Sequence, residues 1–377
     1  MSPARVLFTM TLAERLSGAE EVLWTFLRHV DRSRVEPSCL CVEGEFAREV
    51  AALGVRTWTI PGGRLREARL TVATVARMAR VLRRERPDLA VHWLTKAQLY
   101  GGPAAALAGL AGRSAWWQHD FPTRRPGDRL AAALPAVAVG ACSEAVAEAQ
   151  RRVWPHRPAF AVRPGIEEPA RADPAQLAQL RAGLGAPGSA ALVGIVGRLI
   201  PWKGQHRFLQ ALARLRADGH DVHGLVVGGD AYGLAPGYPA RLRRLARDLG
   251  LEERVTFTGH VESAAPWIEL MDVSVNASAA EPFGVVLLEA MALGTPVVAV
   301  DSAGPREIVE PDRTGILVPG DGALATGMGR LLADDDLRRR VVAAARARYR
   351  DRFTAARMTR EMEDRFTRLA DRNATEP

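Results

Sequence analysis

The sequence has no apolar run long enough to cross a bilayer. Its longest nearly uninterrupted apolar stretches, 101–111 and 130–142, fall short of the roughly 18 to 20 residues that a membrane-spanning helix needs. The first residues also lack the apolar core of about 7 to 15 residues that marks a secretory signal peptide. We therefore expect a cytoplasmic protein that does not span a membrane.

Cysteine and lysine are both scarce. Cys39, Cys41 and Cys142 are odd in number and are spaced neither as a metal-binding motif nor as a redox pair, so we expect reduced thiols. Only Lys96 and Lys203 are lysines among 51 basic side chains, and arginine supplies the rest. With 43 acidic side chains the net charge is +8. This charge indicates either an anionic partner, such as a nucleic acid, an acidic membrane or a phosphorylated small molecule, or simply an arginine-rich composition.

The remaining composition is that of a globular protein with two ordinary domains: 377 residues, 47% hydrophobic and 25% charged. Each half alternates short apolar runs with amphipathic stretches, which predicts two parallel α/β sheets covered on both faces. A segment rich in Pro, Ala and Gly separates the halves. We expect domains at 1–168 and 191–352, a linker at 169–190, and a C-terminal helix at 353–370 that could cross back to the first domain.

The two halves repeat one order of elements. In the first half the expected strands are 6–10, 38–42, 57–60, 89–94, 115–118 and 136–142, and the expected helices are 19–29, 65–84 and 99–111. In the second half the expected strands are 191–196, 223–227, 255–258, 273–276, 296–300 and 315–318. The expected helices there are 205–217, 238–249, 282–293, 322–333 and, after them, one or two long basic helices over 337–369 with a break at 353–354.

The first stretch with chemical meaning is a basic loop. An apolar strand ends at Gly197, the loop carries Arg198 and Lys203 five residues apart, and a helix follows. In open α/β sheets, ligands bind at the carboxyl ends of the strands. An arginine fork and a lysine charge at such a point suit a diphosphate, although a basic loop is as often only a solvated one.

The second stretch is predicted to be a helix of about three turns that begins at Pro282. Gly284 leaves its first turn without a side chain, so an anion can approach the free N–H groups and the positive end of the helix dipole. Glu281 and Glu289 would lie near one face, where carboxylates can accept hydrogen bonds from sugar hydroxyls. Taken alone, two such glutamates are more often surface residues that complement the dipole or form ion pairs.

In this order along the chain, the two stretches resemble the retaining nucleotide-sugar glycosyltransferases with the GT-B fold, in their large bacterial group 1 or family 4 type. Further matching stretches are 17–20, 119–120, 141–145, 162–166, 255–261, 304–309 and 314–318. The resemblance covers nearly the whole chain and is strongest from Gly194 to Val318. It implies an α/β fold with two Rossmann-like doubly wound domains that face a cleft.

The resemblance also implies which residues contact the substrates. Arg198 and Lys203 would bind the diphosphate of the donor, Glu289 the ribose hydroxyls and Glu281 the hydroxyls of the sugar ring. His119 would touch the sugar or the reaction centre. The other implied donor contacts are Gly18 under the diphosphate, Gly197, Val261 beside the base, and the backbone N–H groups of Phe283, Gly284 and Val285.

The implied activity is transfer of a hexose-type sugar, in first place from a UDP-sugar, to a hydroxyl of a small molecule, natural product or glycan. Retention would come from front-side displacement, in which the leaving phosphate takes the acceptor proton. Two cations and a helix end at the diphosphate make a metal or another cofactor unnecessary. The run Asp334, Asp335 and Asp336 is accordingly interpreted as a helix cap. Ser17 and Pro164 depart from the family, which usually has glycine and asparagine there.

Several alternatives stay open. The basic amphipathic stretch 64–86 could lie on an acidic membrane and serve a lipid acceptor, although packing on the N-terminal sheet explains it as well. The same fold could join a non-sugar pair or epimerise its donor. A nucleic-acid or anionic-surface binder is disfavoured because the arginines are spread along the chain and no nucleic-acid motif occurs. Trp93, Trp116, Trp117 and Tyr100 could stack on an acceptor ring or belong to the core, and the oligomeric state is left open.

Overall fold

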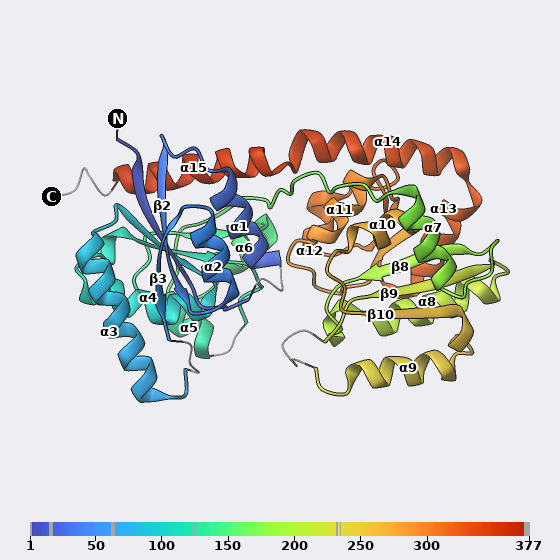
Figure 1. Cartoon of the computed structure of the whole chain (residues 1–377), viewed down its shortest axis with the longest axis horizontal. Helices are drawn as coiled ribbons and strands as arrows, with labels where there is room; N and C mark the ends of the chain where they lie inside the picture. Colours follow the sequence, from blue (N-terminus) through green and yellow to red (C-terminus); the bar gives the residue numbers. More distant parts are fainter. Residues whose placement is uncertain are drawn as a thin grey trace. The chain divides into compact units, whose positions relative to one another are not determined.

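The protein consists of two compact α/β units. The structure is a computed structural model that describes residues 2–14, 18–61, 65–123, 126–230, 233 and 235–372, with the side chain of Arg372 excepted. Unit 1 comprises the chain up to Gly165 together with the C-terminal segment from Ala355, and unit 2 comprises Ile166–Thr354. Each unit is a parallel sheet flanked by helices (Figure 1). The α/β class predicted from the sequence is therefore confirmed in both halves.

In its described part, unit 1 has a sheet of seven parallel strands in the order β3-β2-β1-β4-β5-β6-β7. These strands are β1 (Ala4–Met10), β2 (Val35–Val42), β3 (Arg56–Ile60), β4 (Leu89–Trp93), β5 (Ser114–Gln118), β6 (Val139–Ala141) and β7 (Ala159–Ala161). The helices are α1 (Gly18–His29), α2 (Glu45–Ala52), α3 (Ala68–Glu85), α4 (Thr95–Leu107), α5 (Pro126–Ala133), α6 (Glu144–Arg151) and α15 (Ala355–Arg372). The strand order reverses between β1 and β4, the point at whose carboxyl side such sheets bind ligands.

Both faces of the unit 1 sheet are covered, which is why its central strands read as continuous apolar runs. On one face Phe8 of β1, Phe26 of α1 and Phe366 of α15 meet, with ring centroids 5.4 to 5.5 Å apart. On the other face, α3 and α4 bury side chains such as Met78 and Tyr100 against the sheet. The core of unit 1 therefore unites helices from the two ends of the chain.

In its described part, unit 2 has a sheet of six parallel strands in the order β10-β9-β8-β11-β12-β13. These strands are β8 (Ala191–Val196), β9 (Val222–Val227), β10 (Val255–Gly259), β11 (Val273–Asn276), β12 (Val297–Val300) and β13 (Ile316–Val318). The helices are α7 (Pro174–Gly183), α8 (Gln205–Ala217), α9 (Tyr238–Asp248), α10 (Ala265–Leu270), α11 (Val285–Leu293), α12 (Ala303–Ile308), α13 (Leu324–Ala333) and α14 (Asp335–Arg352). Here the order reverses between β8 and β11.

The sequence pattern predicts the second half better than the first. Strands β8 and β11 and helix α8 match the expected residues, and the two last helices break at the expected Phe353. The pattern does not predict α2, α5 and α6 in the first half or α10 and α12 in the second, because helices of eight residues or fewer show too little amphipathic periodicity. It also does not predict the three-residue strand β7. The helix expected at 99–111 begins earlier, at Thr95. The segment expected as a linker, 169–190, contains helix α7.

The helix expected to start at Pro282 does not start there. Gly284 has a left-handed backbone with φ 108° and is the N-cap, so α11 begins at Val285. The prediction that Pro282 takes the first helical position is wrong, because a left-handed residue cannot continue a right-handed helix. Glu281 consequently lies outside the helix, three residues before its cap.

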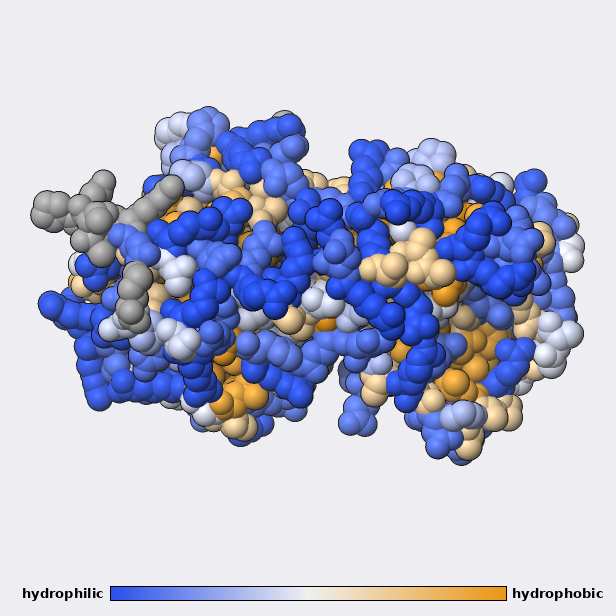
Figure 2. Space-filling view, turned by 90° about the horizontal axis from the view of Figure 1, so that it is seen from above, coloured by the Kyte–Doolittle hydropathy of each residue, from blue (hydrophilic) through white to orange (hydrophobic). Residues whose placement is uncertain are grey.

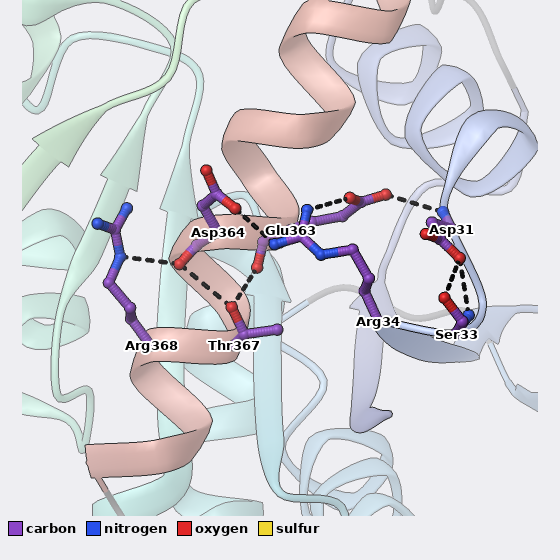
Figure 3. A network of polar contacts seen from close by, with 7 residues as sticks. All are labelled: Asp31, Ser33, Arg34, Glu363, Asp364, Thr367 and Arg368. Carbon is purple, nitrogen blue, oxygen red and sulfur yellow. Dashed lines mark hydrogen bonds and ion pairs between the residues drawn. The ribbon is translucent and has the colours of Figure 1, made fainter. Parts of the chain in front are cut away.

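Helix α15 is fixed to unit 1 by a buried acidic residue as well as by its apolar face. Glu363 is 2% exposed and accepts hydrogen bonds from the backbone N–H of Asp31 and from the guanidinium of Arg34, each at 2.8 Å (Figure 3). Arg34 also pairs with Asp364 at 2.6 Å. Figure 2 shows a surface that is mostly hydrophilic over both units.

Two absences expected from the sequence can be examined in the structure. None of the helices in the described ranges combines the length and apolarity needed to cross a membrane. Cys39, Cys41 and Cys142 are buried and form no disulfide within the described part of the chain, in agreement with the expected reduced thiols. Burial also raises the pKa of the Cys39 thiol well above its usual value, so this thiol stays protonated and packs as an apolar side chain.

Candidate functional site

The basic loop after β8 is pressed against the segment that follows β11. Gly204 ends the loop with φ 79°, and a Cβ atom at this position would lie 2.2 Å from the carbonyl oxygen of Ala277. Only glycine allows both this backbone conformation and this close approach. The loop therefore places Lys203 beside residues that are far away in the sequence but share the carboxyl edge of the sheet.

Lys203 and Glu281 form a buried ion pair at this edge. The Lys203 Nζ donates a hydrogen bond to Glu281 Oε2 at 2.7 Å, and the side chains are only 20% and 5% exposed. The same carboxylate oxygen accepts hydrogen bonds from the Ser278 hydroxyl at 2.9 Å and from the Asn276 amide at 3.4 Å. The Trp202 ring lies under the ammonium, with its centroid 4.4 Å from Nζ. A buried carboxylate with three donors is held in one orientation.

Arg198 is the second cation of the loop. It is half-buried, and its backbone carbonyl accepts a hydrogen bond from Gln205 Nε2 at 2.8 Å, which fixes the loop to the start of α8. Its guanidinium has neither a hydrogen bond nor an ion pair with any residue in the described ranges. Gly197, which precedes it with φ 146°, donates its N–H to the Val227 carbonyl. The structure thus anchors the backbone of Arg198 and leaves its guanidinium available to an anion.

The N-terminus of α11 faces the same edge as Glu281. Gly284 caps the helix, and its N-terminal neighbour Phe283 is buried at 3% exposure. Gly304 of α12 lies so close to Phe283 that a Cβ atom there would approach the Phe283 backbone to 2.3 Å, and its N–H donates to the Glu281 carbonyl. The turn from Glu281 to Val285 is therefore stabilised by its contacts with α12.

Except for Gly18, the other predicted donor contacts lie in unit 2 as well. Glu289 and Val285 are half-buried on α11, one turn apart. Val261 is half-buried after β10 and packs against a small apolar cluster with Leu192 and Val227. Gly228 and Gly229, at the end of β9, are in close contact with Gly197 and His260. The loops after β8, β9, β10 and β11 therefore converge on one edge of the sheet.

His119 and Gly18 belong to unit 1 and are described within it. Gly18 is exposed at the start of α1, and the family departure at Ser17 lies outside the described residues. His119 follows β5, is 9% exposed, and has its ring centroid 5.0 Å from that of Trp93. Its Nε2 has no hydrogen-bond partner in the described part of the chain. Burial lowers the pKa of His119 to about 3, so its imidazole is neutral at physiological pH.

The aromatic residues considered for acceptor stacking are part of the core. Trp93, Trp116, Trp117 and Tyr100 are at most 3% exposed. Trp93 and Trp117 stack on each other with centroids 5.1 Å apart and an interplanar angle of 3°. Residues that sequence reasoning missed are Asn276 and Ser278, which orient Glu281. Their position at the end of the predicted strand 273–276 could have identified them, because functional side chains of parallel sheets lie at the carboxyl ends of the strands.

The acidic run before α14 acts as a helix cap. Asp334 Oδ1 accepts a hydrogen bond from the backbone N–H of Leu337 at 2.8 Å, while Asp335 and Asp336 form ion pairs with arginines one turn later. The predicted capping role is confirmed. Within the described ranges, no three His, Cys, Asp or Glu side chains are grouped so that they could hold a metal ion.

The chain matches known proteins through its second half and through its fold. Residues 178–348 match the family described as glycosyl transferases group 1. The D-inositol 3-phosphate glycosyltransferase of Corynebacterium urealyticum is 40% identical over 164 residues, which cover 42% of this chain and 38% of that protein. The lipopolysaccharide core biosynthesis glycosyltransferase LpsE of Rhizobium meliloti is 35% identical over 43% of this chain and 45% of its own. This chain thus matches less than half the length of either relative.

One solved structure is similar over almost its whole length. The crystal structure of Anabaena HepE in complex with UDP-glucose superimposes with a TM-score of 0.82 and 26% sequence identity, covering 97% of this chain and 99% of that one. The likeness extends through both units, whereas the family match, residues 178–348, lies in unit 2.

Proposed function

We propose that this chain is a glycosyltransferase of group 1 with the GT-B fold, and that it transfers a hexose-type sugar from a nucleoside diphosphate donor, in first place a UDP-sugar, to a hydroxyl group with retention of configuration. The proposed acceptor is a small molecule, a natural product or a glycan. HepE, whose structure contains UDP-glucose, supports the choice of UDP.

The observation that carries the proposal is the ion pair between Lys203 and Glu281. Lys203 lies on the same loop as Arg198, whose guanidinium has no partner among the described residues. All three side chains follow β8 and β11, between which the strand order reverses. A diphosphate at this edge would meet Arg198, Lys203 and the positive end of α11. Glu281, once Lys203 turns to the phosphate, would accept hydrogen bonds from the sugar hydroxyls.

The proposed reaction is a displacement on the face from which the diphosphate leaves. The acceptor oxygen bonds to the anomeric carbon as the bond from that carbon to the phosphate oxygen breaks, and the acceptor proton passes to the leaving phosphate. Negative charge grows on the diphosphate during this step, where Arg198, and Lys203 once it has turned from Glu281 to the phosphate, would stabilise it. We propose that no metal and no other cofactor takes part, and that the neutral His119 positions the sugar.

The direct test is nucleotide binding and donor hydrolysis by the full chain. We expect UDP at millimolar concentration to raise the melting temperature of the protein. We also expect the protein to hydrolyse a UDP-sugar slowly when no acceptor is present, and EDTA should not reduce the rate of this hydrolysis. ADP, GDP and dTDP serve as matched nucleotides. If none of the four stabilises the protein, or if mass spectrometry finds an epimerised donor and no transfer product, the proposal fails.

A lipid acceptor is the second candidate, and the outer face of α3 favours it. Arg69, Arg77 and Arg80 are exposed there together with Val72, which is 68% exposed. A basic face with an apolar residue suits an anionic membrane surface, where a cytoplasmic enzyme would meet a lipid acceptor. Co-sedimentation with liposomes that contain about 30% anionic lipid, compared with neutral liposomes, tests it. Equal recovery with both would remove this candidate.

A further inference from the structure

Unit 1 contains a cavity at the amino ends of β6 and β7, the opposite edge of the sheet from His119. Its volume is about 310 Å³, near the lower end of the range for ligand pockets. Ala138, which leads into β6, Phe160 of β7 and Leu369 of α15 provide apolar walls, and Arg365 and Arg368 of α15 complete the lining. None of these residues belongs to the candidate site described above.

The two arginines of this cavity have no acidic partner in the described part of the chain. The Arg365 guanidinium lies over the Phe160 ring, 4.9 Å from its centroid, and its buried Nε has no hydrogen-bond partner among the described residues. Arg368 donates from Nε to the Asp364 carbonyl at 2.9 Å, which fixes its stem and leaves its terminal nitrogens unengaged (Figure 3). By contrast, Arg357 on the same helix pairs with Glu361.

We propose that this cavity binds a small amphiphilic carboxylate. Its apolar chain would lie against Ala138 and Leu369, and its carboxylate would accept hydrogen bonds from Arg365 and Arg368. A guanidinium placed over an aromatic ring can still direct its N–H fork to a carboxylate, and this fork suits bidentate contact. An unsatisfied buried N–H next to an apolar wall is costly, and an anionic ligand with an apolar body removes this cost.

The cavity is connected to His119 by a continuous series of ring contacts. The rings of Phe160 and Trp117 are in edge-on contact, with their centroids 5.9 Å apart. Trp117 stacks on Trp93, and the ring of Trp93 in turn contacts that of His119. A ligand beside Phe160 should therefore change the magnetic environment of Trp117 before that of more distant indoles. This gives the binding site a spectroscopic signature that nonspecific surface binding would not produce.

Octanoate is the probe, and octanamide, which has the same chain without the charge, is its control. In isothermal titration of the full chain we expect octanoate to bind at least about tenfold more tightly than octanamide. Arg365→Met keeps the aliphatic stem and should weaken octanoate binding roughly ten- to a hundredfold. The matched control is Arg360→Met, an exposed position on the same helix, which should leave the affinity unchanged.

A second variant keeps the proposal falsifiable if Arg365→Met unfolds. Ala138→Leu fills the cavity while both arginines remain, and it should abolish octanoate binding and the shift of the Trp117 indole signal. Equal affinities for octanoate and octanamide, octanoate binding that survives Ala138→Leu, or no octanoate binding at about 10 mM would each overturn the proposal. Melting curves establish that the variants compared are folded.

Discussion

The carboxyl edges of the two sheets are built differently. In unit 2 a buried ion pair, Lys203 with Glu281, is held by further hydrogen bonds, and Arg198, on the same loop as Lys203, has no side-chain partner in the described part of the chain. In unit 1 the corresponding edge carries a neutral histidine, His119, set against stacked indoles. The edge of unit 2 thus carries the ion pair suited to an anionic donor, whereas His119 at the edge of unit 1 is neutral. Under the proposed function, the diphosphate would be bound by unit 2, and His119 would contribute a neutral polar contact.

The largest effect is expected from removing the charge at the unit 2 edge. Lys203→Ala should lower kcat/KM roughly 100- to 1,000-fold, because a cation that would stabilise the leaving diphosphate is lost. Release of UDP from the UDP-sugar measures it. Arg214→Ala, on the outer face of α8 with its side chain 73% exposed, is the control and should retain full activity. If Lys203→Ala lowers kcat/KM by less than about threefold, the charge at the unit 2 edge does not distinguish it functionally from the unit 1 edge.

The next effect comes from the glycine that brings the loop to the edge. Gly204→Ala places a Cβ atom against the Ala277 carbonyl and strains a left-handed backbone, so unit 2 should lose about 2 kcal/mol or more of unfolding free energy. Gly204→Ala should also weaken UDP binding. Gly188→Ala, which has open space around the new methyl group, is the matched control. Urea unfolding measures both, and equal stability of the two variants would contradict the close approach.

Unit 1 should be sensitive to its buried charge in a different way, through stability. Glu363→Ala leaves the Asp31 N–H without its acceptor and Arg34 without its buried partner, and we expect a loss of about 2 kcal/mol from unit 1. Asp364→Ala, one residue further on and 53% exposed, should cost no more than about 0.5 kcal/mol. Denaturant unfolding that shows similar losses for the two variants would mean that α15 is held by its apolar face alone.

The smallest effect is a pH dependence of stability in unit 1. Burial lowers the pKa of His92 and of His119 to about 3, well below the value of about 6.5 in an unfolded chain. The unfolded state therefore takes up protons first, and stability is lost as the pH falls below about 6.5. Each histidine should contribute about 1 kcal/mol of this loss between pH 7 and 5.5. His119→Asn should remove the contribution of His119 to this loss, which urea unfolding at both pH values measures. If the pH dependence of the unfolding free energy is unchanged, His119 is solvated.

The elements that carry the unit 2 site could be predicted from the sequence because their signals are local. Strand β8, the loop with Arg198 and Lys203, and strand β11 are adjacent in sequence to the residues that they position. The pairing of Lys203 with Glu281 could not be predicted in this way, because 78 residues separate them and only the parallel pairing of β8 with β11 brings them together. The short elements of unit 1 could not be predicted for a related reason: their formation depends on contacts with neighbouring elements more than on the periodicity of their own residues.

The sequence by itself determined the α/β class, the order of most elements, the cap formed by Asp334 and the residue types of the candidate site. These follow from hydrophobic periodicity and from side-chain chemistry, which act over a few residues. Tertiary structure alone decided that α11 begins after Gly284, that the tryptophans of β4 and β5 are core, and that α15 returns to unit 1. Each of these depends on which distant atoms fill the space around a residue, and local propensity does not contain that information.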